Sequence, residues 1–87
     1  MSYTVTVERR AAKFLRALTD KRLSLRLREA IDGLAESPRP PGSVKLQGEG
    51  ELYRVRVGDY RIVYQIQDAV LVVLVVQIGH RREIYRQ

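Results

Sequence analysis

Apolar and polar residues alternate along residues 52–64, LYRVRVGDYRIVY, with one interruption at Gly58-Asp59. Alternation with a period of two predicts two β-strands, and a Gly-Asp pair between them predicts a two-residue hairpin turn. A turn of this length fixes the register of the hairpin. The expected pairs are Val57 with Tyr60, Arg56 with Arg61, Val55 with Ile62, and Arg54 with Val63.

The same alternation gives the hairpin two chemically different faces. One face is apolar and needs a covering layer: Tyr53, Val55, Val57, Tyr60, Ile62 and Tyr64. The other face is expected to stay uncovered and carries Arg54, Arg56, Arg61, Val63 and Gln65. Like charges opposite each other destabilise a sheet, and alternating signs would protect an edge strand equally well. Three arginines at paired positions therefore indicate a site shaped for an anion.

The remaining pattern predicts helices before the hairpin and strands around it. Helical periodicity extends over 8–18 and 21–36, with a break and N-cap at Thr19-Asp20. The Pro-rich segment PRPPG (38–42) cannot stay helical. Strands are expected over 3–7, 44–46 and 69–78, with a turn near Gln67-Asp68. These elements predict a single α+β domain over residues 1–87, with two helices on one face of a mostly antiparallel, twisted sheet.

Composition excludes several classes of function. The chain has 87 residues, no cysteine and one histidine, so neither a disulfide framework nor a dedicated zinc site is expected. The longest apolar run, 69–76, is too short to span a bilayer, and the first residues lack the apolar core of a secretory signal. We therefore expect a cytoplasmic protein without membrane contact and without a cofactor.

Charge points to a polyanionic partner. The formal net charge is +6, and 13 of the 16 basic residues are arginine because lysine occurs only at Lys13, Lys21 and Lys45. The planar guanidinium group suits phosphate, which favours nucleic acid or an acidic protein as partner.

The C-terminal segment GHRREIYRQ adds chemistry to the same region. If the apolar strand lies beside the hairpin, its end brings His80, Arg81, Arg82 and Tyr85 towards the hairpin arginines. Together with those arginines they would suit RNA, which proteins bind by stacking and phosphate contacts. Glu83 is expected to form an ion pair with one of these arginines.

The segments SPRPPGSVKLQGEGELYRVRVGDYRIVYQI and VVQIGHRREIYR resemble the RelE branch of the RelE/ParE toxin superfamily of bacterial toxin–antitoxin modules. The resemblance covers nearly the whole chain and implies a RelE-like fold of the microbial ribonuclease type. It implies a toxin that cleaves messenger RNA in the ribosomal decoding site without a metal. The implied partners are the 70S ribosome, messenger RNA and a RelB-like antitoxin with an acidic helical segment. We expect a monomeric toxin that forms a hetero-oligomer with its antitoxin.

The resemblance also implies roles for individual residues. The family's catalytic positions fall on Arg54, Arg56, Arg61, Arg81 and Tyr85, and Lys45, His80 and Arg82 are expected to contact RNA. The implied reaction is attack of the 2′-hydroxyl on the adjacent phosphate, which leaves a 2′,3′-cyclic phosphate and a 5′-hydroxyl. Charge grows on the phosphate and the leaving oxygen, so guanidinium groups placed in advance stabilise the transition state.

This chain departs from the best-known relatives at two positions, because Arg54 and Arg56 stand where those proteins carry lysine. Arginine does not lose its proton in proteins, so both residues would act electrostatically and not as a base. The base then comes from Tyr85, His80, Glu83 or the ribosome.

Two other functions compete with RNA cleavage. The ParE branch shares the fold and poisons DNA gyrase through protein contacts, without catalysis. A pure binding module, whose arginine face only holds an acidic partner, fits the charge pattern as well.

Overall fold

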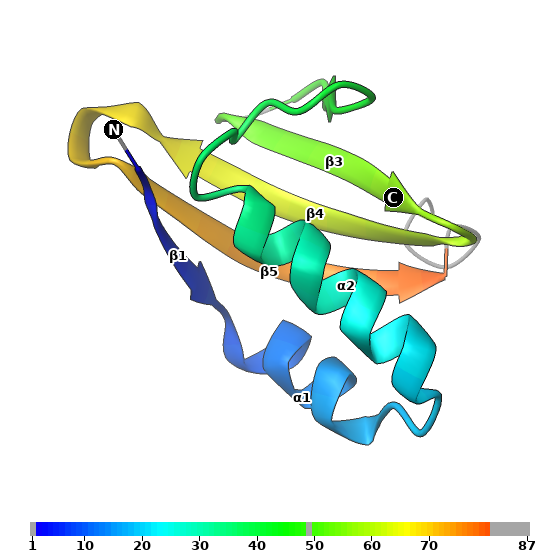
Figure 1. Cartoon of the computed structure of the whole chain (residues 1–87). Coiled ribbons are helices and arrows are strands. Elements are labelled where there is room, and N and C mark those ends of the chain that lie inside the picture. The colour runs from blue at the N-terminus through cyan, green and yellow to red at the C-terminus, as the bar shows by residue number, and fades with distance from the viewer. Residues whose placement is uncertain (1, 49, 81–87) are drawn as a thin grey trace.

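The computed structural model of the chain describes residues 2–48 and 50–80. Two helices lie across one face of a curved sheet, and no other helix of the described residues covers the opposite face (Figure 1), which we call the uncovered face. In chain order the elements are β1 (Thr4–Val7), α1 (Arg9–Ala17), α2 (Lys21–Gly33), β2 (Val44–Lys45), β3 (Leu52–Val57), β4 (Tyr60–Gln67), a short 3-10 turn (Asp68–Val70) and β5 (Val72–His80). Within the described residues, neither helix is long and apolar enough to cross a bilayer.

The sheet has five strands in the order β1-β5-β4-β3-β2. Neighbours run antiparallel except β1 and β5, which pair in parallel with Thr4 beside Val72. Along the chain, the two helices and the hairpin separate β1 from β5. In the sheet, however, the first strand of the chain lies beside the last one. This arrangement confirms the predicted α+β fold, including the apolar strand beside the hairpin.

The hairpin has the register that the sequence predicts. All four expected pairs form, from Val57 with Tyr60 at the turn to Arg54 with Val63. Gly58 opens the turn with φ +60°, a conformation that glycine adopts without strain. The turn residue therefore fixes the opposition of the two central arginines.

The last strand differs from its predicted bounds and is irregular. It begins at Val72 and not at residue 69, because Asp68–Val70 form a 3-10 turn that Leu71 ends with φ +55°. Its pairing with β4 shifts by one residue after Val63, so that Val63 faces Gln77 while Tyr64 faces Val75. Without this β-bulge, strict alternation would turn Gln77 into the core and Ile78 away from it.

The core lies between the helices and the apolar side of the sheet. Ala11 and Leu15 of α1 and Leu27 and Ile31 of α2 are buried there, against a larger set from the strands: Tyr53, Val57, Ile62, Tyr64, Ile66, Val73, Val75 and Ile78. Asp20 caps α2 as predicted, because its carboxylate accepts a 3.0 Å hydrogen bond from the backbone N–H of Leu23. The two helices end at residues 17 and 33, and the second is three residues shorter than predicted.

Candidate functional site

Three arginines share the uncovered face of the sheet at the turn end of the hairpin. Arg54 and Arg56 lie on β3, and Arg61 lies on β4 directly opposite Arg56. Val57 and Tyr60, the pair beside the turn, are of the hydrogen-bonded type. The next pair, Arg56 and Arg61, is therefore of the non-hydrogen-bonded type, in which the Cα atoms are about 4.5 Å apart. The two side chains start from the closest spacing that an antiparallel sheet offers.

The arginines differ in exposure, which the sequence did not predict. Arg56 is exposed and Arg54 is half-buried, whereas only 8% of Arg61 is exposed to solvent. Arg61 lies on the central strand β4, between β3 and β5. Its partner on β5 is Gly79, which adds no side chain beside the guanidinium. The predicted shared face is therefore present, but its three arginines are not equally exposed.

The hairpin turn orients the side chain of Arg56. Its Nε donates a 2.8 Å hydrogen bond to the backbone carbonyl of Gly58. The contact directs the guanidinium towards the turn and uses one of its five N–H donors. The side chain stays exposed, so its other donors are available to a ligand.

Two predicted RNA contacts lie on the other face. His80 pairs with Tyr60, and the two rings meet edge to face with centroids 5.6 Å apart. Tyr60 packs on the helix-covered side, so His80 shares that side and not the arginine face. Lys45 pairs with Tyr53 on β3 and lies on the same side, while its neighbour Val44 pairs with Arg54.

The other predicted site residues cannot be placed. Arg81, Arg82 and Tyr85 lie outside the described residues, and so does Glu83. Their predicted roles therefore stay predictions.

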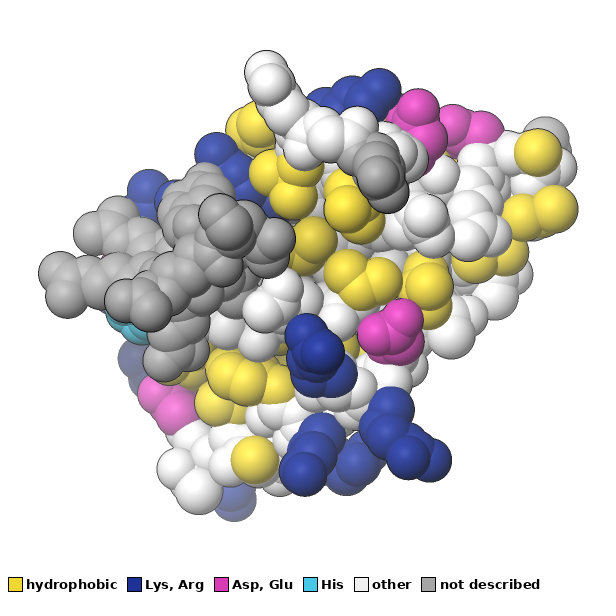
Figure 2. Space-filling model, turned by 180° about the vertical axis from the view of Figure 1, so that it is seen from behind, with side chains coloured by type: hydrophobic (Ala, Val, Ile, Leu, Met, Phe, Trp, Pro, Cys, Tyr) yellow, Lys and Arg dark blue, Asp and Glu magenta, His cyan; other side chains and the backbone are white. Residues whose placement is uncertain are grey.

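A hollow with a mixed polar and apolar lining lies farther along the uncovered face, beyond the arginines. Figure 2 shows this face from behind, with hydrophobic side chains gathered across its middle. The hollow has a volume of about 650 Å³ and is lined by Glu8, Gln47, Gly50, Leu52, Gln65, Leu74 and Val76. A surface with an apolar strip and arginines at one end fits an amphipathic segment that carries carboxylates.

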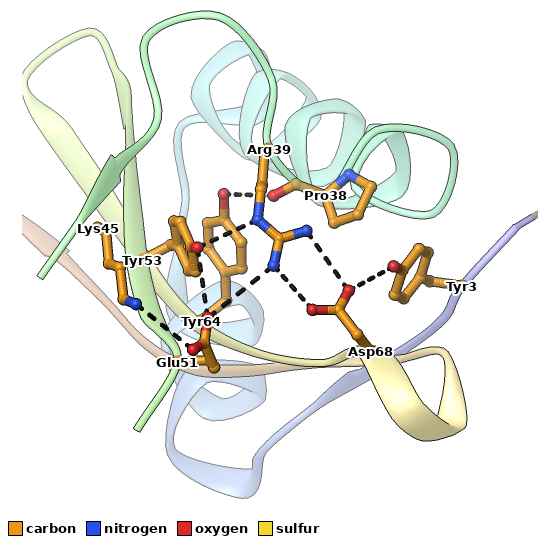
Figure 3. A network of polar contacts seen from close by, with 8 residues as sticks. All are labelled: Tyr3, Pro38, Arg39, Lys45, Glu51, Tyr53, Tyr64 and Asp68. Carbon is orange, nitrogen blue, oxygen red and sulfur yellow. Dashed lines mark hydrogen bonds and ion pairs between the residues drawn. The ribbon is translucent and has the colours of Figure 1, made fainter. Parts of the chain in front are cut away.

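Sequence patterns missed a polar network that fastens the Pro-rich connector to the sheet (Figure 3). Arg39 donates to both carboxylate oxygens of Asp68, at 2.8 and 3.4 Å, and to the hydroxyl of Tyr53 at 3.1 Å. Tyr3 donates to the same carboxylate at 2.6 Å. The network joins the N-terminus, the connector and the turn before β5, three segments that are far apart in sequence. Only the fold brings them together.

The network changes the protonation of its members. The hydrogen bonds from Arg39 and Tyr3 hold the pKa of Asp68 below its usual value. The same contact with Asp68 raises the pKa of Arg39 and that of Tyr3. Because the network lies away from the three hairpin arginines, we assign it to stability and not to catalysis.

Comparisons with known proteins agree with this fold. Residues 5–85 match the family model of the ParE toxin of type II toxin–antitoxin system, parDE. The mRNA interferase toxin RelE of Escherichia coli K12 is 32% identical over 91 residues, which cover 100% of this chain and 94% of that protein. Toxin RelG of Mycobacterium tuberculosis is 29% identical over 87 residues and the full length of both chains.

Solved structures show the same relationship. A chain of the archaeal RelE-RelB complex from Pyrococcus horikoshii superposes with a TM-score of 0.82 at 31% identity, over 95% of this chain and 99% of that one. The family model covers almost the whole chain, and the similarity to RelE proteins extends over sequence and fold. The chain therefore belongs to the RelE/ParE superfamily of type II toxin–antitoxin systems and is a RelE-type toxin.

Proposed function

We propose that this toxin is an RNA endonuclease that cuts messenger RNA in the decoding site of the ribosome and so stops translation. The observation that carries the proposal is the opposition of Arg56 and Arg61, with Arg54 on the same face. An unfavourable pair of like charges becomes favourable once a phosphate binds between them. The E. coli relative named an mRNA interferase supports the same activity.

The chemistry needs charge stabilisation more than a protein nucleophile. The 2′-oxygen loses its proton and forms a bond to the adjacent phosphorus, while the bond from phosphorus to the 5′-oxygen breaks and that oxygen gains a proton. The products are a 2′,3′-cyclic phosphate and a 5′-hydroxyl. Arg54, Arg56 and Arg61 would bind the phosphate as its negative charge grows, without requiring a metal ion.

The reaction also needs a group that accepts the proton of the 2′-hydroxyl. Neither Arg54 nor Arg56 can accept the 2′-hydroxyl proton, because a guanidinium stays protonated. His80 lies on the helix-covered side of the sheet beside Tyr60, which places it poorly for a phosphate held on the arginine face. Tyr85, Glu83 and the ribosome are then the remaining sources of a base, with Arg81 contributing charge and Tyr85 stacking on a base of the RNA.

Primer extension on a defined message in a reconstituted translation system tests the activity. We expect cuts inside codons at the decoding site only when ribosomes are present. Arg56→Gln should reduce the cleavage rate by about 10²- to 10³-fold, the usual effect of removing one group that stabilises transition-state charge. Arg28→Gln, which removes an exposed charge on α2, is the matched control and should cleave normally.

A different result would identify the competing function. An intact message together with inhibition of DNA supercoiling by gyrase would refute RNA cleavage and establish ParE-type action. Equal rates for Arg56→Gln and the control would refute the assignment of the arginine face while keeping the activity.

We also propose that a cognate antitoxin covers the uncovered face. Its apolar residues would pack into the hollow around Leu52, Leu74 and Val76, and its carboxylates would reach the arginines at the hairpin end. The archaeal RelE relative was solved as a complex with RelB, which supports a partner of this kind. Leu74→Arg should weaken antitoxin binding in a pull-down with the co-encoded protein and leave ribosome-dependent cleavage intact. Unchanged capture would place the antitoxin elsewhere.

A further inference from the structure

A side chain of α2 reaches the hairpin turn from the helix layer. A Cβ atom at Gly58 would lie 3.6 Å from Nη1 and 3.7 Å from Nη2 of Arg26, with Cζ next at 4.0 Å. The two terminal nitrogens are thus the nearest atoms, and the end of the guanidinium points at the turn. Because Gly58 has no side chain, the end of Arg26 takes up the space beside it.

Ion pairing does not explain where the guanidinium of Arg26 lies. Asp20 and Asp59 line the same small hollow between α2 and the turn. Among residues 2–48 and 50–80, however, neither carboxylate forms an ion pair with Arg26, and its guanidinium donates no hydrogen bond. The contact between Arg26 and the turn is therefore one of packing.

The same glycine orients Arg56. The backbone carbonyl of Gly58 accepts the 2.8 Å hydrogen bond from Nε of Arg56. Arg56 starts on the uncovered face, opposite Arg61, whereas α2 lies on the other side of the sheet (Figure 1). The guanidinium groups of Arg26 and Arg56 therefore approach Gly58 from different sides.

The orientation of Arg56 depends on how firmly the turn is held. A carbonyl directs a donor only as well as its own peptide is fixed, and glycine has the largest conformational freedom of any residue. Arg56 is exposed and long, so it has rotamer freedom to lose. Packing of Arg26 restrains the Gly58 peptide, and repulsion between the two cations disfavours rotamers that bring Arg56 to the helix side.

We infer that Arg26 is a positioning residue, which braces Gly58 and thereby holds Arg56 on the arginine face. Arg26 itself would not touch RNA. The consequence for cleavage rests on the proposed function, whereas the link from Arg26 to Arg56 is a property of the free toxin. The two parts can therefore be tested separately.

The first test follows hydrogen exchange of the Arg56 Nε–H by NMR in the full chain without RNA. The variant is Arg26→Gln. The control is Arg22→Gln, which removes the same charge from an exposed position on the same helix and in the same hollow. We expect Nε–H exchange about three- to tenfold faster in Arg26→Gln, because its hydrogen bond opens more often, and unchanged exchange in the control.

The second test measures ribosome-dependent cleavage. Arg26→Gln should lower kcat about tenfold with little change in KM, because a small displacement of a group that stabilises the transition state slows the chemical step. In the background of Arg56→Gln, the same change should have no further effect, since it acts through Arg56. A merely structural role of Arg26 would lower the rate equally in both backgrounds.

Each measurement has a result that would overturn the inference. Unchanged exchange of the Arg56 Nε–H in Arg26→Gln, or equal acceleration in Arg22→Gln, would show that Arg26 does not position Arg56. Additive losses of rate in the two backgrounds would show the same. Faster exchange in Arg26→Gln alone, with no cleavage by the parent chain, would establish the positioning contact and refute the proposed function.

Discussion

The repulsion between Arg56 and Arg61 leads to a measurable prediction about the stability of the toxin without RNA. In a double-mutant cycle with Arg56→Gln and Arg61→Gln, the interaction term should be unfavourable in the parent chain. Each single variant also loses packing or hydrogen bonds, including the bond from Arg56 to the carbonyl of Gly58. The cycle cancels those losses and isolates the pair term.

The magnitude follows from the sheet geometry. The Cα atoms of the pair are about 4.5 Å apart, but the turn carbonyl draws the guanidinium of Arg56 towards the hairpin end, so we take roughly 8 Å between the charges. Coulomb's law then gives about 0.5 kcal/mol in bulk water and about 2 kcal/mol at an effective dielectric constant of 20. Arg56 is exposed, so the lower half of this range applies, and we expect about 0.5–1 kcal/mol.

Urea unfolding of the four proteins at low and high salt provides the assay. The Debye screening length falls from about 10 Å at 0.1 M salt to about 3 Å at 1 M salt. Most of the interaction term should therefore disappear at the higher salt concentration. An uncleavable single-stranded RNA should stabilise the parent chain far more than either single variant, because the phosphate needs both arginines.

An interaction term that is zero or attractive at low salt would refute the reasoning. It would mean that the guanidinium groups do not sense each other, and the explanation of their pairing by a bound phosphate would then lose its basis. A term that persists at 1 M salt would point to steric strain and not to charge.

Three further predictions concern the fold. Leu27→Ala should destabilise the protein by about 2–5 kcal/mol in urea unfolding because Leu27 is completely buried, whereas Leu25→Ala, at a position 57% exposed, should have little effect; similar values would contradict the assigned core. Tyr64→Phe should cost about 1 kcal/mol by the same assay, because it removes a buried 2.8 Å hydrogen bond to a connector carbonyl. Asp68 has a lowered folded-state pKa, with the contact from Arg39 as the largest cause, so its contribution is present above about pH 3.9 and is lost as the pH falls through the folded value. Asp68→Asn should therefore be less stable than the parent near pH 7, and the difference should shrink in strongly acidic solution; a constant difference would exclude the ion pair as its cause.

Local rules determined much of this protein from its sequence. The alternation around Gly58-Asp59 gave the hairpin register, and hence the Arg56–Arg61 pair, because a two-residue turn permits only one register. The capping role of Asp20 was predictable for the same reason, since it depends on residues only three positions apart. The fold class followed from the order and the apolar faces of the elements.

Tertiary structure decided the features that depend on distant neighbours. Periodicity does not reveal the bulge after Val63, which keeps Gln77 out of the core and sets the face of His80. The contact of Arg39 with Asp68 joins two loops that are 29 residues apart, and no local pattern links them. Sequence determined which residues share a face, because that is local geometry, whereas packing decided how exposed each one is and what it contacts.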